Sequence, residues 1–328
     1  MQSLRHMLMA MVAILAGILA LTGSSQAGYP NKPVTILVGF PAGGPTDLGA
    51  RALAKAAEPF FPQPMTVVNK PGGGSVLATN EVVHARPDGY TLGGILNNTL
   101  TVSPHLSLSL PYKGPDDITP LMHYLGQHLA FNVRADSPFK TAQEMIAYAK
   151  ANPGKLRIAH SGLGSATHIL LESLVALGVP LTMVPMEGAA PVMMALLGGH
   201  VDGLVLNIGP VLPHIRAGKF RYLAVFAEER EKVIPELANV PTFKEVGYNV
   251  LTDCPEYYIS APNGTPKAVT DMLYEALVKA AKSPTYQSFL GDNGFQTPGG
   301  TAEIRKVLNE SYKFYKEFLP KIGLKPQK

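Results

Sequence analysis

Short apolar runs rich in β-branched residues alternate with helix-like segments along most of the 328-residue chain. The first run, at residues 34–40, leads directly into a turn-forming Pro-Ala-Gly-Gly-Pro segment at residues 41–45. A continuous apolar run suits a strand that is buried on both faces of a parallel sheet, and the helix after it supplies the crossover to the next strand. The alternation therefore predicts an α/β fold built from βα units.

The same pattern divides the chain into two lobes. Further strands are expected at residues 65–68, 90–96, 129–133, 156–159, 181–184, 201–206, 222–226 and 257–261. The pattern beyond residue 265 predicts helices only. These helices have no sheet of their own, so they must pack on the N-terminal strands. We therefore expect a discontinuous first lobe (residues 28–130 with 254–328) and a second lobe (131–253). Two βα lobes with a hinge of two chain crossings are typical of proteins that close on a ligand.

Composition narrows the class of protein further. Hydrophobic residues make up 46% of the chain and charged residues 16%, which is enough apolar surface for large cores and excludes intrinsic disorder. The net charge is only +4 with no basic stripe, so no nucleic-acid partner is expected. The single cysteine, Cys254, excludes an internal disulfide and is expected to be buried and inert.

The N-terminus has the three parts of a secretory signal peptide. A start carrying Arg5 is followed by an apolar run at residues 7–21 and by small residues up to Ala27, so we expect cleavage after residue 27. The run is shorter than the ~20 residues that a membrane-spanning helix needs, which makes a permanent anchor the less favoured alternative. The sequence predicts an exported soluble protein.

Two loops are candidates for a binding site. Residues 40–47 and 161–165 both lie between an expected strand and the start of an expected helix, in different lobes. Such a loop offers unpaired backbone N–H groups and the positive end of a helix dipole, which can bind an anion without a cationic side chain. The alternative is that the glycines of each loop only make tight turns.

The motifs of the chain, taken together, resemble a known family. Residues 29–47 (Tyr-Pro-Asn-Lys-Pro-Val-Thr-Ile-Leu-Val-Gly-Phe-Pro-Ala-Gly-Gly-Pro-Thr-Asp) are similar to the start of mature solute receptors of the tripartite tricarboxylate transporter (TTT) family, also called Bug proteins. Further matches follow in the family's order at residues 69–72 (Asn-Lys-Pro-Gly), 87–92 (Pro-Asp-Gly-Tyr-Thr-Leu), 153–156 (Pro-Gly-Lys-Leu), 161–165 (Ser-Gly-Leu-Gly-Ser), 198–202 (Gly-Gly-His-Val-Asp), 212–219 (Leu-Pro-His-Ile-Arg-Ala-Gly-Lys), 240–242 (Val-Pro-Thr) and 261–266 (Ala-Pro-Asn-Gly-Thr-Pro).

The resemblance implies a type II periplasmic binding protein fold. We also expect a monomer without a cofactor or metal. Such a receptor binds a small organic carboxylate between its lobes and delivers it to the TTT membrane permease. Carried over by position, the implied ligand-binding residues are Phe40, Gly43, Gly44, Thr46, Asp47, Asn97, Ser161, Gly164, Ser165 and Asn207. Asp47 is expected to cap its helix and hold a water, because a carboxylate repels an anionic ligand.

Three departures from the family pattern bear on the ligand. The chain has Met186-Glu187-Gly188 where the family usually has Tyr-Lys-Gly, Leu206 where an aspartate is usual, and Ser75-Val76 in place of Gly-Asn. If Met186 and Glu187 reach the cleft, a mono- or dicarboxylate with a compact apolar body becomes the favoured ligand over citrate. The alternative is that Met186 packs inside its lobe and Glu187 is solvated.

Two other functions remain as alternatives: an exported α/β enzyme acting on a small carboxylate, and a sensor component for a membrane kinase. Ser137 and Lys140 fit a Ser-x-x-Lys pattern, but the partner motifs of penicillin-recognising hydrolases are missing. His160 and His168 form a possible metal pair without an evident third ligand, and no nucleophile–base pair emerges.

Overall fold

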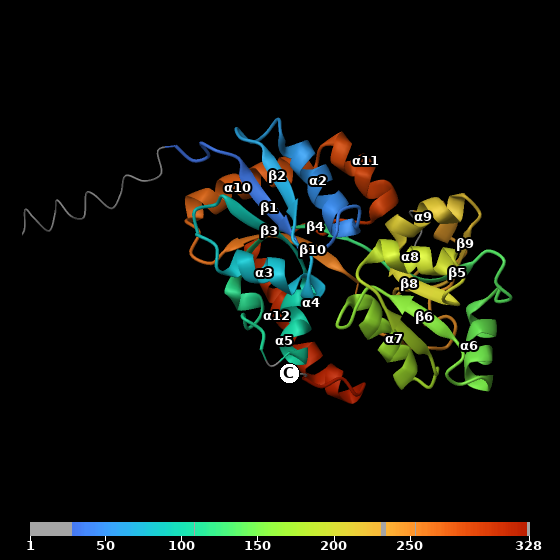
Figure 1. Ribbon diagram of the computed structural model, residues 1–328. Coiled ribbons are helices and arrows are strands. Elements are labelled where there is room, and N and C mark those ends of the chain that lie inside the picture. The colour runs from blue at the N-terminus through green and yellow to red at the C-terminus, as the bar shows by residue number, and fades with distance from the viewer. Residues whose placement is uncertain (1–27, 108, 231–233, 253, 327–328) are drawn as a thin grey trace, which may run out of the picture.

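The structure, a computed structural model, describes residues 28–326 apart from residues 108, 231–233 and 253, so the expected signal peptide lies outside the described residues. Two α/β lobes lie side by side (Figure 1). Among the described helices, none combines the length and the apolar character needed to cross a membrane.

The first lobe is built on a five-stranded sheet in the order β2-β1-β3-β10-β4. Its strands are β1 (Val34–Val38), β2 (Met65–Asn69), β3 (Thr91–Leu96), β4 (Ile118–Gly126) and β10 (Glu256–Pro262). Strands β1, β2 and β3 run parallel, whereas β10 pairs antiparallel with both β3 and β4. The strands of the N-terminal βα series are therefore parallel, as their pattern predicts, whereas β10 returns from the other lobe and enters the sheet in the opposite direction.

Strand β4 was not among the expected strands, since Pro120 and His123 interrupt its apolar pattern. Its position at the edge of the sheet explains why it tolerates a proline, which cannot donate a hydrogen bond to a neighbouring strand.

The second lobe repeats this plan in the order β7-β6-β8-β5-β9. Its strands are β5 (Leu129–Arg134), β6 (Arg157–His160), β7 (Thr182–Pro185), β8 (Gly203–Asn207) and β9 (Phe220–Phe226). Here β5, which arrives from the first lobe, is the strand that runs antiparallel to its neighbours. In each lobe, one strand delivered by the other lobe thus lies between two strands of opposite direction.

Helices cover both faces of each sheet (Figure 1). They are α2 (Pro45–Ala57), α3 (Val76–Val83), α4 (Asn97–Thr101), α5 (Ser103–Leu106), α6 (Ala142–Ala151), α7 (Ala166–Ala176), α8 (Ala189–Leu197), α9 (Ile208–Arg216), α10 (Lys267–Ala281), α11 (Pro284–Asn293) and α12 (Thr301–Lys321). In the first lobe, α2, α10 and α11 share one apolar core with the sheet, and α3, α4 and α12 share another. In the second lobe, α6 and α7 pack on one face and α8 and α9 on the other.

The first crossing between the lobes occurs just before β5. Leu129 and Ala130 already pair with β8 and β9 in the second sheet, so the expected boundary after residue 130 is two residues late. The returning chain reaches β10 through Cys254, which is half-buried and not buried as expected. Asn97 contacts this return segment, because its Nδ2 donates to the Cys254 carbonyl (3.3 Å) and its Oδ1 accepts from the Glu256 N–H (3.3 Å).

An apolar cluster also joins the lobes away from the crossings. Ile169 of α7 is buried together with Val102, Tyr315 and Leu319 of the first lobe. The C-terminal helix α12 therefore packs on both the first sheet and the second lobe. This agrees with the expectation that the C-terminal helices bury their apolar faces against the strands of the first lobe.

Gly39, directly after β1, tests how tightly the glycine-rich segment of residues 71–75 packs on the first sheet. A Cβ at this position would lie 1.9 Å from Ser75 Oγ and 2.6 Å from Ser75 Cα, so the backbone itself must move. We expect Gly39→Ala to lower the free energy of unfolding by about 1–3 kcal/mol, measured by urea denaturation. Gly291→Ala is the control, since nothing lies within 4 Å of its Cβ position in helix α11. Equal stability of the Gly39→Ala variant and the wild type would contradict this packing.

Candidate functional site

A cavity of about 260 Å³ lies between the two lobes. Its size is slightly below the ~300 Å³ at the lower end of ligand pockets, so it suits a small molecule. The lining comes from both lobes and comprises residues 40–46, Leu96, Ser161, Ser165, Ala166, Thr167, residues 187–191, Met193, Leu206, Asn207, Pro255 and Tyr257. No lysine or arginine is among these described lining residues, so any anion must be stabilised by dipoles and hydrogen bonds.

The N-terminus of α2 forms the first half-site. Gly44 precedes the helix and Pro45 occupies its first turn, where the missing proline N–H costs nothing. Within the described part of the chain, no acceptor bonds the backbone N–H groups of Thr46 and Asp47. Gly43 adopts φ +85°, a left-handed conformation that favours glycine, and this turn carries the loop from β1 into the helix.

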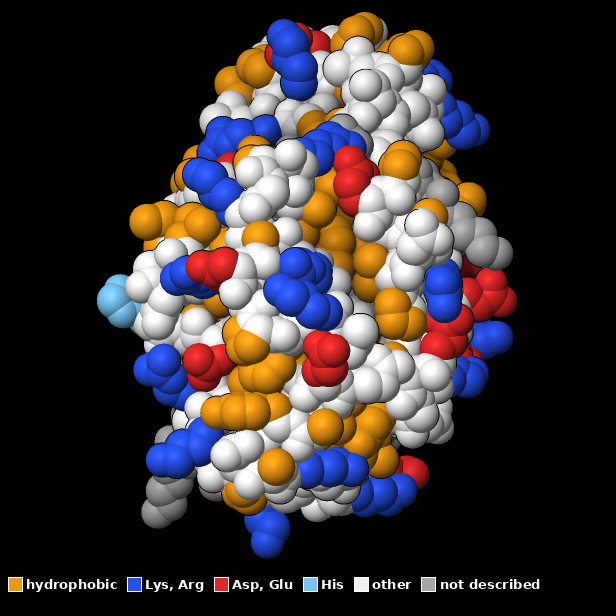
Figure 2. Space-filling view, turned by 90° about the vertical axis from the view of Figure 1, so that its right-hand side faces the viewer, with side chains coloured by type: hydrophobic (Ala, Val, Ile, Leu, Met, Phe, Trp, Pro, Cys, Tyr) orange, Lys and Arg blue, Asp and Glu red, His pale blue; other side chains and the backbone are white. Residues whose placement is uncertain are grey.

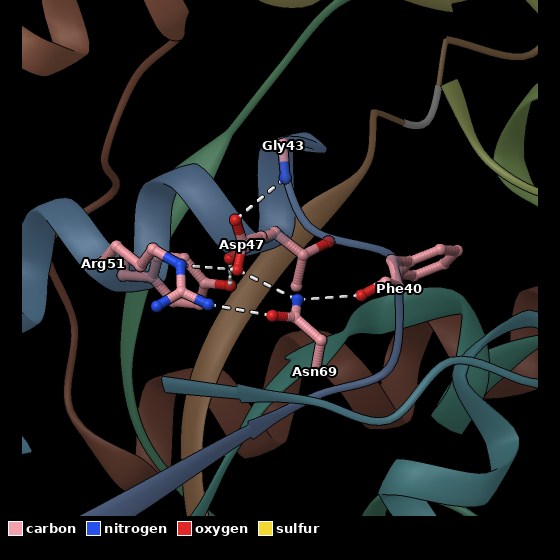
Figure 3. A network of polar contacts seen from close by, with 7 residues as sticks. Phe40, Gly43, Asp47, Arg51 and Asn69 are labelled. Atoms are coloured by element: carbon pink, nitrogen blue, oxygen red, sulfur yellow. Dashed lines mark hydrogen bonds and ion pairs between the residues drawn. The ribbon is translucent and has the colours of Figure 1, made fainter. Parts of the chain in front are cut away.

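Asp47 holds this loop from behind (Figure 3). Its buried carboxylate accepts hydrogen bonds from the Gly43 N–H (2.9 Å), from Asn69 Nδ2 (2.9 Å) and from Arg51 Nε (2.8 Å). Asn69 also donates to the Phe40 carbonyl (3.0 Å) and accepts from Arg51 Nη2 (2.8 Å). Asn69 at the end of β2 and Asp47 in the first turn of α2 thus fix both ends of the loop, which pre-organises its N–H groups for an anion.

The N-terminus of α7 forms the second half-site. Ser165 caps the helix by accepting a hydrogen bond from the His168 N–H (3.3 Å). The Thr167 hydroxyl connects the loop: it accepts from the Ser161 N–H (3.0 Å) and bonds the hydroxyls of Ser161 (2.9 Å) and Ser165 (2.8 Å). The backbone N–H groups of Ala166 and Thr167 have no acceptor within the described residues.

A third helix N-terminus and the return segment complete the cavity. The start of α8, at residues 188–191, forms one wall together with Glu187 and Met193. Met186 instead packs against the core of its own lobe, so only Glu187 of this pair reaches the cavity. Tyr257 also lines the cavity, where Asn207 Nδ2 approaches its hydroxyl at 3.4 Å. Burial raises the pKa of Tyr257 well above its usual range, so this hydroxyl stays neutral.

Seven of the ten residues carried over from the family line the cavity: Phe40, Gly43, Gly44, Thr46, Ser161, Ser165 and Asn207. The other three lie behind its walls. Asp47 holds the first loop, Asn97 bonds the return segment, and the Gly164 N–H is donated to His168 Nδ1 (3.1 Å). Sequence reasoning did not single out Thr167, although its position two residues after a helix cap was a usable signal.

Two stacked histidines lie directly behind the second half-site. The rings of His160 and His168 are 4.9 Å apart, and His160 Nδ1 is 3.1 Å from the Gly162 carbonyl. His168 Nδ1 accepts from Gly164, which leaves its Nε2 to donate toward Glu172 at 3.4 Å. Burial, together with the charge of the neighbouring His168, lowers the pKa of His160 to about 4, and burial lowers that of His168. Both rings are therefore neutral at pH 7 and hold the loop by hydrogen bonds alone.

The alternative chemistries considered from the sequence find little geometric support. Ser137 Oγ accepts a hydrogen bond from the Phe139 N–H (3.2 Å), and Lys140 Nζ donates to the Ser137 carbonyl (2.9 Å), so the pair forms a local turn. Among the described residues, no group of three metal-ligating side chains comes together. What the cavity offers is hydrogen-bond donors at converging helix N-termini, which is the chemistry of anion binding.

The neutral state of His160 predicts a loss of stability in acid. The unfolded chain takes up a proton at the ordinary histidine pKa near 6.5, whereas folded His160 does so only near pH 4. The free energy of unfolding should therefore fall as the pH drops from about 6.5 to about 4. In urea denaturation at pH 7, 6, 5 and 4, His160→Gln should show a smaller fall than the wild type. The exposed His200→Gln control should match the wild type, and an equal fall in all three proteins would contradict this role of His160.

Comparison with known sequences agrees with this geometry. Residues 49–324 match the model of the "Tripartite tricarboxylate transporter family receptor". A "UPF0065 protein in gbd 5'region" of Cupriavidus necator is 33% identical over 311 residues, which covers 94% of this chain and 93% of the relative.

Solved structures with the same two-lobed fold are similar over nearly their whole length. The periplasmic binding protein BugD is 30% identical with a TM-score of 0.84, covering 91% of this chain and 100% of that chain. MatC of Rhodopseudomonas palustris with bound malate is 29% identical (TM-score 0.81, 88% and 99% covered). A second R. palustris protein, with adipate, is 25% identical (TM-score 0.84, 91% and 100% covered). The chain belongs to the family of tripartite tricarboxylate transporter receptors.

Proposed function

We propose that this protein is a periplasmic receptor that closes its lobes on a small organic carboxylate and delivers it to the membrane permease of a tripartite tricarboxylate transporter. The observation that carries the proposal is the pair of helix N-termini, α2 in one lobe and α7 in the other, that open on one small cavity with unpaired N–H groups. Helix ends of this kind favour negative charge.

The position of the cavity supports binding that is coupled to closure. Each half-site belongs to a different lobe, so a ligand that contacts both gains its full set of hydrogen bonds only when the lobes are together. Charged side chains of both signs are interspersed on the face shown in Figure 2. The related structures with malate and adipate hold small dicarboxylates, and a cavity of about 260 Å³ suits small ligands of that kind.

Membership of a family with periplasmic binding proteins supports a periplasmic location and a binding function for the proposed receptor. Export through a cleaved signal of residues 1–27 and action on a single permease are part of the proposal. A monomeric state is also part of the proposal.

Calorimetric titration of the purified mature protein with small mono-, di- and tricarboxylates tests the proposal. At least one carboxylate should bind with a one-to-one stoichiometry, and small-angle scattering should show a more compact protein with ligand than without. Mass analysis should recover the ligand unchanged, whereas turnover would favour an enzyme. Absence of binding across the panel would overturn the proposed function.

Asn69 tests whether the network behind the first half-site sets the affinity. Asn69→Ala removes the donor to both the Phe40 carbonyl and the Asp47 carboxylate, so the loop loses two of its restraints. We expect roughly tenfold weaker binding of the best carboxylate, in line with about 1–2 kcal/mol for the lost hydrogen bonds. Asn152→Ala is the control, because that exposed amide bonds only the Tyr148 carbonyl at the end of α6. Wild-type affinity in the Asn69→Ala protein would show that the loop does not need this support.

A further inference from the structure

Glu187 stands where the cavity meets a second hollow. That hollow, about 320 Å³ in volume, is lined by residues 71–74 of the first lobe and by residues 161–163 and 185–188 of the second, among others. The cavity and the hollow share Phe40, Pro41, Ser161, Glu187 and Gly188. A ligand long enough to extend from one into the other therefore passes this shared set of residues, which includes Glu187.

Among the described residues that line either space, Glu187 is the single charged side chain. It is exposed, and within the described part of the chain it forms neither an ion pair nor a side-chain hydrogen bond. Asp47, the other carboxylate near the site, is by contrast buried behind its loop and paired with Arg51. The negative charge of Glu187 is thus available to a ligand, whereas that of Asp47 is not.

The segment that carries Glu187 is close to both half-sites. A Cβ at Gly188 would lie 3.7 Å from Pro41 Cδ, and a Cβ at Gly162 would lie 3.6 Å from the Met186 carbonyl oxygen. Glu187 also directly precedes Gly188, the cap of α8, where a carboxylate offsets the positive end of the helix. Of the three helix N-termini around the cavity, α8 is therefore the least suited to hold a carboxylate of the ligand.

We propose that Glu187 makes the cavity selective for carboxylates with one negative charge and a hydrogen-bond donor at the other end, a hydroxyl or an ammonium group, over dicarboxylates of the same length. The inference rests on the proposed function and specifies its ligand class. One carboxylate binds at the N-termini of α2 and α7. A donor at the far end forms a charge-assisted hydrogen bond with Glu187, whereas a second carboxylate there meets a like charge.

Two matched series of compounds test this selectivity by calorimetry at pH 7. The first is succinate, 4-hydroxybutyrate and 4-aminobutyrate, and the second is adipate, 6-hydroxyhexanoate and 6-aminohexanoate. Within a series, the length is similar and the terminal group changes from anion to neutral donor to cation. In at least one series, the wild type should bind the hydroxy or amino compound roughly tenfold more tightly than the dicarboxylate.

Variants at position 187 should change the preference in a graded way. Glu187→Gln removes the charge at nearly constant size and should bring the members of a series within about threefold of one another. Glu187→Lys should make the dicarboxylate the tightest ligand. Glu275→Gln is the control, because it makes the same charge change at an exposed position of α10 away from the cavity, and its preference should match that of the wild type. Thermal melts of all four proteins check that folding is unchanged.

The outcomes separate this inference from the proposed function. If the wild type binds dicarboxylates most tightly, or if Glu187→Gln keeps the wild-type preference, the role of Glu187 is overturned while carboxylate binding stands. If the Glu275→Gln control shifts the preference as much as Glu187→Gln does, net charge and not the cavity is responsible, and the inference fails. If none of the six compounds binds any of the proteins, the inference fails, and the proposed function is then decided by the wider panel of mono-, di- and tricarboxylates.

Discussion

The return of the chain into the middle of the first sheet is the constraint on which the rest of the structure depends. Strand β10 comes from the second lobe and lies between β3 and β4, so neither lobe is complete without the other. The parallel strands of each sheet end at the edge that faces the other lobe, and the helices after them begin there. The cavity is a consequence of this arrangement, which follows the general rule that ligands bind beyond the carboxyl ends of such strands.

The site illustrates how a protein can form a binding site for an anion with few charged side chains of its own. Its donors are the first N–H groups of helices, which have no partner inside the helix itself. Asp47 adds negative charge near this place, but its carboxylate is saturated by Gly43, Asn69 and Arg51 and acts as a fixed acceptor for the loop. The stacked histidines behind α7 likewise hold the loop of the second lobe through hydrogen bonds. Burial lowers the pKa of His160, so this ring stays neutral at pH 7.

Part of this could be predicted from residue patterns, and part could not. The β-branched runs predicted nearly all the strands, but β4 was hidden by Pro120 and His123, because only its edge position permits the proline. The two loops were correctly placed at strand ends and both contribute to one cavity. The place of Tyr257 in the cavity could not be predicted, since nothing in a linear sequence shows that a strand from residue 256 onward passes beneath a cavity formed by residues 40–46 and 161–167.

The sequence by itself determined the local events: where strands stop, which glycines turn the chain, and which helices begin with unpaired N–H groups. These depend on neighbours within a few residues, and that information is present in the order of side chains. Only the tertiary structure decided that Asp47, Asn97 and Gly164 hold the walls while Thr167 and Glu187 line the cavity. A side chain can face a ligand, or it can support a backbone segment that faces the ligand. Which of the two it does depends on the packing of segments far apart in the chain, and that packing follows from how the chain passes between the two sheets.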